Sequence, residues 1–214
     1  MKYMMLDDKY ARMPWDEIDT VVFDIGGVLI AYTPDKYLEK LFPDDPAMRT
    51  VMKTRVFSSP YWHMMDRGLL TQEEAIVRMT GLRHDLADAI RHTVIDWTQY
   101  FDEVIDEGVR FLNACRAHGK KVFVLSNFIR EPFAQMRPRF DFFDLFDELV
   151  VSGYVHKVKP SPDIFQYVID TYQLNPARTL FIDDSFMNIE ACLFAGWQGV
   201  CFNVPGKLDA LLAE

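Results

Sequence analysis

Short apolar runs that each end abruptly in polar residues constrain the fold of this chain more than any other feature. Four runs are clear and a fifth is weaker: Thr20–Asp24, Val122–Asn127, Leu149–Gly153, Thr179–Asp184 and, less distinctly, Gly199–Asn203. Runs of β-prone residues that are apolar on both faces are typical of parallel strands with helices on both sides of the sheet. The sequence therefore predicts such a sheet.

Helical patterns separate these runs in the second half of the chain. One covers Phe101–Ala117 and stops at Gly119, and another covers Ser185–Ala195 and stops at Gly196. Ser161-Pro162-Asp163 reads as a helix start, with a serine N-cap, proline in the first turn and an acid at the positive helix end. Helices and strands thus alternate from about residue 101, which predicts an α/β fold with a doubly wound parallel, Rossmann-like sheet.

Residues 34–100 have a different pattern. Apolar side chains recur at helical spacing, Thr71-Gln-Glu-Glu74 reads as a capping box, and no convincing strand is present. We expect an all-helical insertion after the first strand. The predicted division is an α/β core of 1–33 and 101–214 with a helical cap of 34–100.

Composition excludes several classes of protein. The 214 residues carry a net charge of −9, which argues against a nucleic-acid-binding surface. No apolar run reaches the roughly 18–20 residues that a membrane span needs, and the N-terminus lacks the apolar segment of a signal peptide. Cys115, Cys192 and Cys201 lie in apolar surroundings without metal-ligand spacing, as buried thiols in a reducing compartment do. We expect a cytoplasmic protein that is a monomer or a weak homodimer.

Polar residues at the strand ends form the candidate site. In a doubly wound sheet, ligands bind at the carboxyl ends of the strands, where this chain has Asp24, Asp183 and Asp184. Three converging carboxylates repel one another unless a cation lies among them, and oxygen ligands of this kind suit Mg²⁺. Ser126 and Asn127 offer neutral donors for phosphate oxygens, and Lys159 adds a positive charge. The pattern predicts a phosphate site built around magnesium.

Each of these residues also has an ordinary structural explanation. An aspartate after a strand is often a turn former, and Asp183-Asp184 is also suited to capping the next helix. Ser126-Asn127 is a common turn pair, and Lys159-Pro160 a common loop. The functional interpretation rests on their occurring together, in this order, each at a strand end.

The same residues resemble the four motifs of the haloacid dehalogenase superfamily. Phe23-Asp24-Ile25-Gly26-Gly27-Val28-Leu29 looks like the first motif, Val124–Asn127 the second, Lys159-Pro160 the third, and Phe181–Ser185 with Asn188 the fourth. The likeness spans about residues 20–204. The insertion at 34–100 is similar to the small helical cap that follows the first motif in one subfamily, and residues 65–71 look like the turn before that cap's capping-box helix.

The resemblance implies a mechanism. Asp24 would attack phosphorus and form an aspartyl-phosphate that water hydrolyses. Asp24, the carbonyl of Gly26 and Asp184 would ligate Mg²⁺ directly, with Asp183 in an outer role. The substrate would contact Ser126, Asn127, the amide of Gly27 and Lys159. Ser126 and Lys159 would also take part in catalysis. The substrate would be a small phosphorylated metabolite.

One position departs from the family pattern. Many phosphatases of the superfamily have a second aspartate, the general acid and base, two residues after the nucleophile, where this chain has Gly26. A cap residue such as His63 or Asp66 supplying the proton is one explanation. A leaving group that needs little help, such as that of a sugar 1-phosphate, is the second, and a slow or inactive relative is the third. Some members with an Asp-x-Gly motif resemble sugar-phosphate phosphatases, so a sugar phosphate is one substrate hypothesis.

The cap segment 61–67 has two interpretations. His63 and Arg67 are candidate substrate-binding residues; alternatively Trp62, Met64 and Met65 are cap core and His63 is a surface residue. A loop exposed to solvent is the simpler explanation for His156 and Lys157. Three rival functions stay open: a non-catalytic phosphometabolite-binding module, a phosphotransferase or mutase, and a 2-haloacid dehalogenase, for which the predicted metal site has no use.

Overall fold

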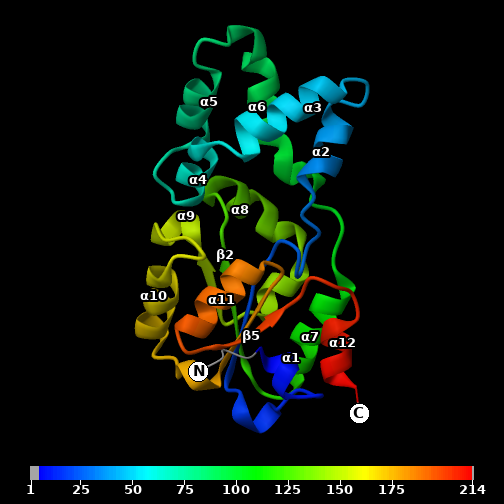
Figure 1. The fold of residues 1–214 in the computed structure, drawn as a ribbon, viewed down its shortest axis with the longest axis vertical. Helices are drawn as coiled ribbons and strands as arrows, with labels where there is room; N and C mark the ends of the chain where they lie inside the picture. The colour runs from blue at the N-terminus through cyan, green and yellow to red at the C-terminus, as the bar shows by residue number, and fades with distance from the viewer. Residues whose placement is uncertain (1–4, 214) are drawn as a thin grey trace.

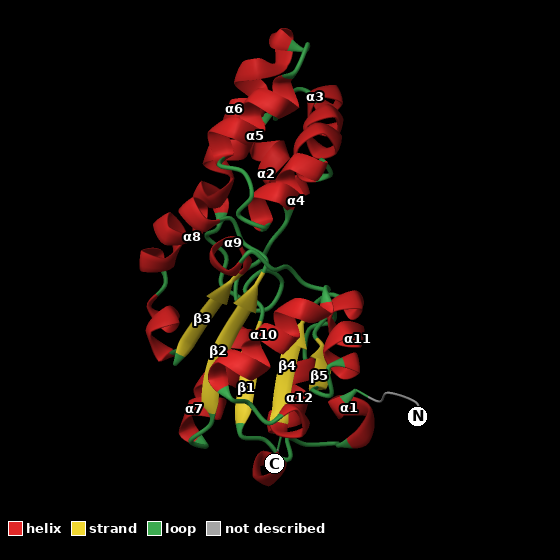
Figure 2. Cartoon of the chain, turned by 90° about the vertical axis from the view of Figure 1, so that its left-hand side faces the viewer, coloured by secondary structure: helices red, strands yellow, loops and turns green. Residues whose placement is uncertain are grey.

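A five-stranded parallel sheet forms the centre of the molecule in the computed structural model, which describes residues 5–213. Its order is β3-β2-β1-β4-β5, with bounds β1 Thr20–Phe23, β2 Lys121–Ser126, β3 Glu148–Val151, β4 Thr179–Asp183 and β5 Gln198–Cys201. Figure 2 shows the strands side by side with their carboxyl ends toward the helical part. β1 lies between β2 and β4, with Val22 in register with Phe123 and Phe181. The predicted doubly wound sheet is confirmed.

The alternation of side chains along β1 explains why both faces are covered. Val21 and Phe23 belong to the core on one face, together with side chains of α7 (Asp106–Ala117) and α12 (Lys207–Leu212). Val22 belongs to the core on the other face, with α10 (Pro162–Tyr172) and α11 (Phe186–Phe194). All three β1 side chains are fully buried, as the continuous apolar run requires. Three short helices complete this part: α1 Leu6–Lys9, α8 Arg130–Met136 and α9 Ser152–Val155.

Every named element between residues 34 and 100 is helical. The α-helices are α2 Pro34–Leu41, α3 Pro46–Met52, α4 Pro60–Asp66, α5 Gln72–Thr80 and α6 Ala87–Asp96, with a π-helix at Lys53–Phe57 and 3-10 helices at His84–Leu86 and Trp97–Tyr100. They form the upper part of Figure 1, above the carboxyl ends of the strands. The capping box is confirmed, because Thr71 and Glu74 each accept a hydrogen bond from the other's backbone amide.

One helix boundary differs from the expectation, and two expected features, the Ser161 N-cap and the polar residues after the third apolar run, are present with added detail. α7 begins at Asp106 rather than Phe101, because residues 101–105 return from the helical region as an extended segment that bridges Ile30 through Val104. Ser161 is the N-cap of α10, but its side chain makes no capping hydrogen bond. β3 ends at Val151, and the polar residues after it begin α9.

The three cysteines are buried and unpaired, as expected. Within residues 5–213, no helix has the length and apolar character that crossing a bilayer requires.

Candidate active site

Asp24 lies directly after β1, at the point where the winding of the sheet reverses. Its side chain is largely buried. One carboxylate oxygen, Oδ1, accepts a hydrogen bond from the Ile25 amide at 2.7 Å, and the other, Oδ2, lies 2.9 Å from Lys159 Nζ. Burial raises the pKa of Asp24 to about 7; Lys159 opposes this rise, the charge of Asp183 adds to it, and a hydrogen bond from Ser126 opposes it. The nucleophile candidate is therefore fixed in orientation by both of its oxygens.

Lys159 links two of the three predicted carboxylates. Its Nζ lies 2.9 Å from Asp24 Oδ2 and 2.7 Å from Asp183 Oδ2, and its side chain is almost completely buried. Burial lowers the pKa of the lysine, but the charges of Asp183 and Asp24 raise it more, so that the net pKa is above its ordinary value. Lys159 is thus a permanent positive charge that lies against Asp24 and Asp183 without itself lining the cavity.

Asp183 has partners on every side. Besides Lys159, it accepts hydrogen bonds from the Ser185 amide at 2.8 Å and from Asn188 Nδ2 at 2.9 and 3.0 Å. It is fully buried. This pattern agrees with an outer, orienting role for Asp183.

Asp184 is the exposed member of the acidic cluster. Carboxylate oxygens of Asp24, Asp183 and Asp184 all lie within 4.8 Å of one another, and burial together with the charge of Asp183 raises the pKa of Asp184. A cluster of hard oxygen ligands with this mutual repulsion fits a magnesium ion. The convergence that the sequence predicted at the strand ends is present.

Gly27 makes room for Asp184. It has φ +73°, and a Cβ at this position would lie 2.4 Å from Asp184 Oδ2. Both the conformation and the contact require glycine. Its amide, however, donates to the Ile30 carbonyl at 2.9 Å, so the backbone turn already uses the donor that was expected to bind phosphate.

Ser126 and Asn127 differ in role. Ser126 is buried, and its hydroxyl acts to lower the pKa of the Asp24 carboxyl. The Asn127 side chain donates to the Lys159 carbonyl at 2.9 Å and accepts from the Lys159 amide at 2.8 Å. This reciprocal pair fixes the segment that carries Lys159, a positioning role that the motif alone did not reveal.

Asp66 is the acidic group that the helical region places toward Asp24. Both line one cavity of about 280 Å³, and burial raises the pKa of Asp66 to about 7. The backbone around Asp66 is docked on the core, because Ser152 Oγ donates to the Asp66 carbonyl at 2.6 Å and accepts from the Phe128 amide at 2.9 Å. Next to it, His156 Nδ1 lies 2.9 Å from the Arg67 carbonyl.

The two predicted substrate-binding residues of the helical region have different positions. His63 lines the cavity and has an exposed side chain. Arg67 does not line it. The pKa of Asp163 is lowered mainly by a hydrogen bond from Ser161, then by Lys157, and the charge of Arg67 lowers it further. A substrate-binding role for Arg67 stays a prediction.

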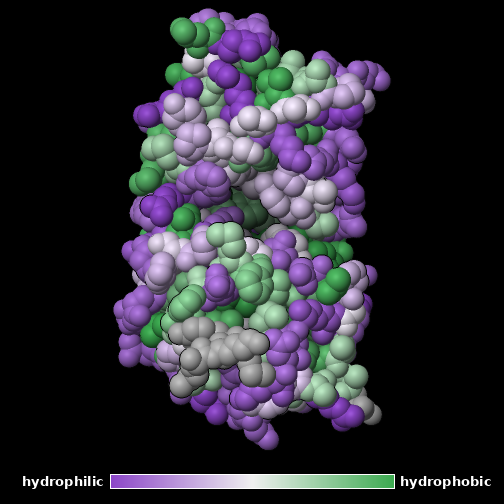
Figure 3. Space-filling view, in the orientation of Figure 1, coloured by the Kyte–Doolittle hydropathy of each residue, from purple (hydrophilic) through white to green (hydrophobic). Residues whose placement is uncertain are grey.

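The cavity lies between the helical region and the strand ends. Figure 3 shows a recess between the upper and lower parts of the molecule. The floor of the cavity carries Asp24, Gly26, Ser126, Asn127 and Asp184, and its other walls are Tyr32, Phe57, Trp62, His63, Asp66, Trp97, Phe101 and Phe128. The carboxyl ends of the parallel strands thus carry a buried carboxylate, a buried lysine and an acidic cluster. This arrangement is suited to phosphoryl transfer.

Comparison with known proteins identifies the class. Residues 18–196 match the family of haloacid dehalogenase-like hydrolases, and the chain belongs to this family. It is 26% identical over 186 residues to D-ribitol-5-phosphate phosphatase of Bacteroides thetaiotaomicron, covering 80% of this chain and 85% of that protein. It is 22% identical over 185 residues to sesquiterpene phosphatase astK of Aspergillus oryzae, covering 84% and 87%.

A solved structure has the same fold. A haloacid dehalogenase family enzyme of Bacteroides thetaiotaomicron, in complex with magnesium and inorganic phosphate, superposes with a TM-score of 0.67 at 20% identity, covering 86% of this chain and 93% of that one. The chain is therefore an enzyme of the hydrolase class with named phosphatases among its relatives.

Sequence reasoning missed the residues that shape the cavity above the strand ends. Ser152, Trp97, Phe101 and Phe128 carry no motif, and each reads as an ordinary turn or core residue. Only the apolar character of the segments on either side of the helical insertion pointed toward them.

Proposed function

We propose that the protein is a magnesium-dependent phosphatase that hydrolyses a small phosphorylated metabolite through an aspartyl-phosphate on Asp24. The observation that carries this proposal is the geometry of Asp24, whose two oxygens are held by Lys159 and the Ile25 amide at the floor of the cavity. A carboxylate oxygen of Asp24 attacks phosphorus, and the bond from phosphorus to the ester oxygen breaks. Water then attacks the phosphorus of the acyl phosphate, which releases inorganic phosphate and regenerates the carboxylate.

The residues present fit a magnesium ion. Asp24, Asp184 and the Gly26 carbonyl would hold it, with Asp183 behind them, and the ion would supply charge neutralisation for the transferring phosphoryl group. Lys159 lies between Asp24 and Asp183 and stabilises negative charge on the phosphoryl oxygens. Ser126 orients Asp24, and Asn127 fixes the Lys159 segment and faces the cavity.

Asp66 acts as the general acid and base, a role for which Gly26 has no side chain. The helical region acts as a cap, and its docked turn holds Asp66 in the cavity that Asp24 also lines. In the first step Asp66 donates its proton to the leaving alcohol; in the second step its carboxylate takes a proton from the attacking water. The pKa of about 7 makes both protonation states accessible near neutral pH. His63 is exposed and becomes a substrate contact rather than the acid.

The test is phosphate release from a panel of phosphate esters with and without magnesium. We expect turnover that needs the ion and that Asp24→Asn abolishes. Turnover in excess chelator or in the Asp24→Asn variant would contradict the mechanism. Release of phosphate from no ester would instead favour the non-catalytic rival, transfer to an alcohol acceptor the phosphotransferase, and metal-independent halide release the dehalogenase.

The named relatives leave the alcohol part of the substrate open. A sugar alcohol phosphate and a sesquiterpene are chemically unlike, so these relatives support the phosphatase class and no particular leaving group. Location in the cytoplasm and a monomeric or weakly dimeric state stay predictions.

A further inference from the structure

Aromatic side chains form most of the cavity wall above Asp24. Six of the thirteen lining residues are aromatic, so the wall offers mainly apolar contact. They come from the helical region, from both linkers and from the loop after β2: Tyr32, Phe57, Trp62, Trp97, Phe101 and Phe128.

These rings make one connected surface centred on Trp97. The centroid of its ring lies 5.1 Å from Trp62, 5.1 Å from Phe101 and 5.2 Å from Phe128, and Phe57 lies 4.7 Å from Trp62. Trp62, Trp97, Phe101 and Phe128 are each less than 7% exposed. Contacts of this kind hold the rings in fixed orientations, so the wall is preformed.

Polar groups on the same wall are few. Among the described residues that line the cavity, none is lysine or arginine, and the polar side chains above the strand ends are Tyr32, His63 and Asp66. Trp97 Nε1 is a further donor, buried and without a hydrogen-bond partner among the described residues. A polyol that entered this space would lose water from several hydroxyls and find partners for only some of them, which is unfavourable.

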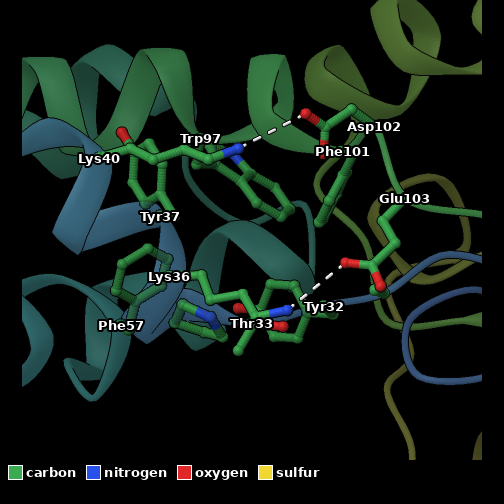
Figure 4. Close-up of a pocket in the computed structure, with 12 residues that line it drawn as sticks. Tyr32, Thr33, Lys36, Tyr37, Lys40, Phe57, Trp97, Phe101, Asp102 and Glu103 are labelled. Atoms are coloured by element: carbon green, nitrogen blue, oxygen red, sulfur yellow. Dashed lines mark hydrogen bonds and ion pairs between the residues drawn. The ribbon is translucent and has the colours of Figure 1, made fainter.

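A second, smaller cavity lies against four of the same aromatic residues. It has a volume of about 60 Å³ and shares Tyr32, Phe57, Trp97 and Phe101 with the first cavity. Figure 4 shows these rings together with two ion pairs, Lys36 with Glu103 and Lys40 with Asp102, each at 3.5 Å. Because each pair is internally neutral, the rim offers no net charge for a second anionic group, while the rings offer apolar surface beyond the first cavity.

We propose that the preferred substrates are phosphate monoesters of hydrocarbon alcohols, with an alkyl, prenyl or aryl group lying against the aromatic wall and its far end reaching the smaller cavity. This deepens and rests on the proposed phosphatase function. The sugar phosphate that the sequence suggested is the alternative that the test below compares with it. The wall selects the alcohol part by burying apolar surface, while the groups at the strand ends bind the phosphate.

The test is a series of n-alkyl phosphates from ethyl to octyl, assayed for phosphate release with magnesium. Leaving-group reactivity is nearly constant along the series, so a trend in kcat/KM reports apolar burial alone. We expect kcat/KM to rise about fourfold per methylene until the cavities are filled. n-Pentyl phosphate should exceed D-ribitol 5-phosphate, which has the same carbon number, by about tenfold or more.

A matched pair of variants ties the trend to the wall. Phe57 and Phe140 are both half-buried and in tilted contact with another ring, but only Phe57 lines the two cavities. Phe57→Asn should reduce the rise per methylene to about twofold or less, and Phe140→Asn should leave it unchanged. Equal slopes in both variants would overturn the assignment of the wall.

The outcomes separate the two proposals. A flat or falling alkyl series with good turnover of the polyol phosphate overturns the hydrocarbon assignment and leaves the phosphatase intact. No release from any ester, including an aryl phosphate, contradicts both.

Discussion

Replacing Asp66 by asparagine tests the proposed general acid with the least disturbance of shape. At pH 7 a carboxyl with the ordinary pKa of 3.8 is protonated in about one molecule in 1,600. Burial raises the pKa of Asp66 to about 7, so that about half of the molecules carry the proton. The fraction of enzyme with a usable acid is thereby about 800-fold larger, and this lies within the range of about 10²–10⁴ that a positioned acid contributes.

The expected loss depends on the leaving group. Asp66→Asn should lower kcat/KM for an alkyl phosphate by about 10²–10³-fold, because the departing alkoxide then has no proton donor. It should lower kcat/KM for p-nitrophenyl phosphate less than about tenfold, because that phenolate leaves as a stable anion and kcat/KM does not include the later hydrolysis of the aspartyl-phosphate. His63→Gln, on the same cavity wall, should affect both substrates by the same factor. Stopped-flow and steady-state phosphate release measure all four combinations.

Two results would refute the reasoning. One is an equal loss for both substrates in Asp66→Asn with the fold intact, which would make Asp66 a positioning residue. The other comes from thermal unfolding in chelator. Since the folded pKa is raised, Asp66 costs stability as pH rises from about 4 through about 7, so the Tm advantage of Asp66→Asn over wild type should grow over that interval. Asp24, Asp184, His63 and Tyr32 face the same cavity and are common to both proteins; a constant difference in Tm would contradict the raised pKa.

Three further changes test the architecture of the site. Gly27→Ala should abolish magnesium binding in calorimetry because its Cβ displaces Asp184, whereas Gly119→Ala, also at positive φ but with open space, should cost about 1 kcal/mol of stability and leave metal affinity unchanged. Lys159→Met leaves two buried carboxylates without their cation and should lower the free energy of unfolding in chelator by about 3–5 kcal/mol, measured in urea. Ser152→Ala leaves the Phe128 amide and the Asp66 carbonyl without their hydrogen-bond partner and should lower the free energy of unfolding by about 1–3 kcal/mol. No loss of stability would mean that the contact is unimportant.

Local signals were sufficient for the sheet and for the strand-end residues. The apolar runs around Val22 and Phe181 fix the strands because a strand buried on both faces has no other stable arrangement. Once a parallel sheet is granted, its geometry brings Asp24 and Asp183 together at one edge. Thr71 and Glu74 define the start of α5 by a hydrogen-bonding pattern that is complete within four residues.

Predictions that depended on distant partners were less complete. The helical spacing of apolar residues begins at Phe101, which predicts a helix from that residue. The backbone of residues 101–105 is not helical, however, and pairs with Ile30 through Val104. Arg67 does not line the cavity, and its backbone carbonyl lies 2.9 Å from Nδ1 of His156, 89 positions along the chain. The amide of Gly27 is used by a turn that no composition pattern reveals. In each case the competing partner is set by tertiary packing.

Lys159 alone does not balance the negative charges at the strand ends. Lys159 contacts both Asp24 and Asp183 but leaves Asp184 without a counter-charge, so the four groups together carry two negative charges when all the carboxylates are ionised. A divalent cation would bring the net charge of these groups to zero. A bound phosphate dianion then brings the net charge back to minus two, and this charge lies on the group to be transferred. Proton donation from Asp66 to the leaving alcohol adds no positive charge to the cavity. Because none of the described residues in the aromatic wall is lysine or arginine, the charge balance has to be met by the groups at the strand ends.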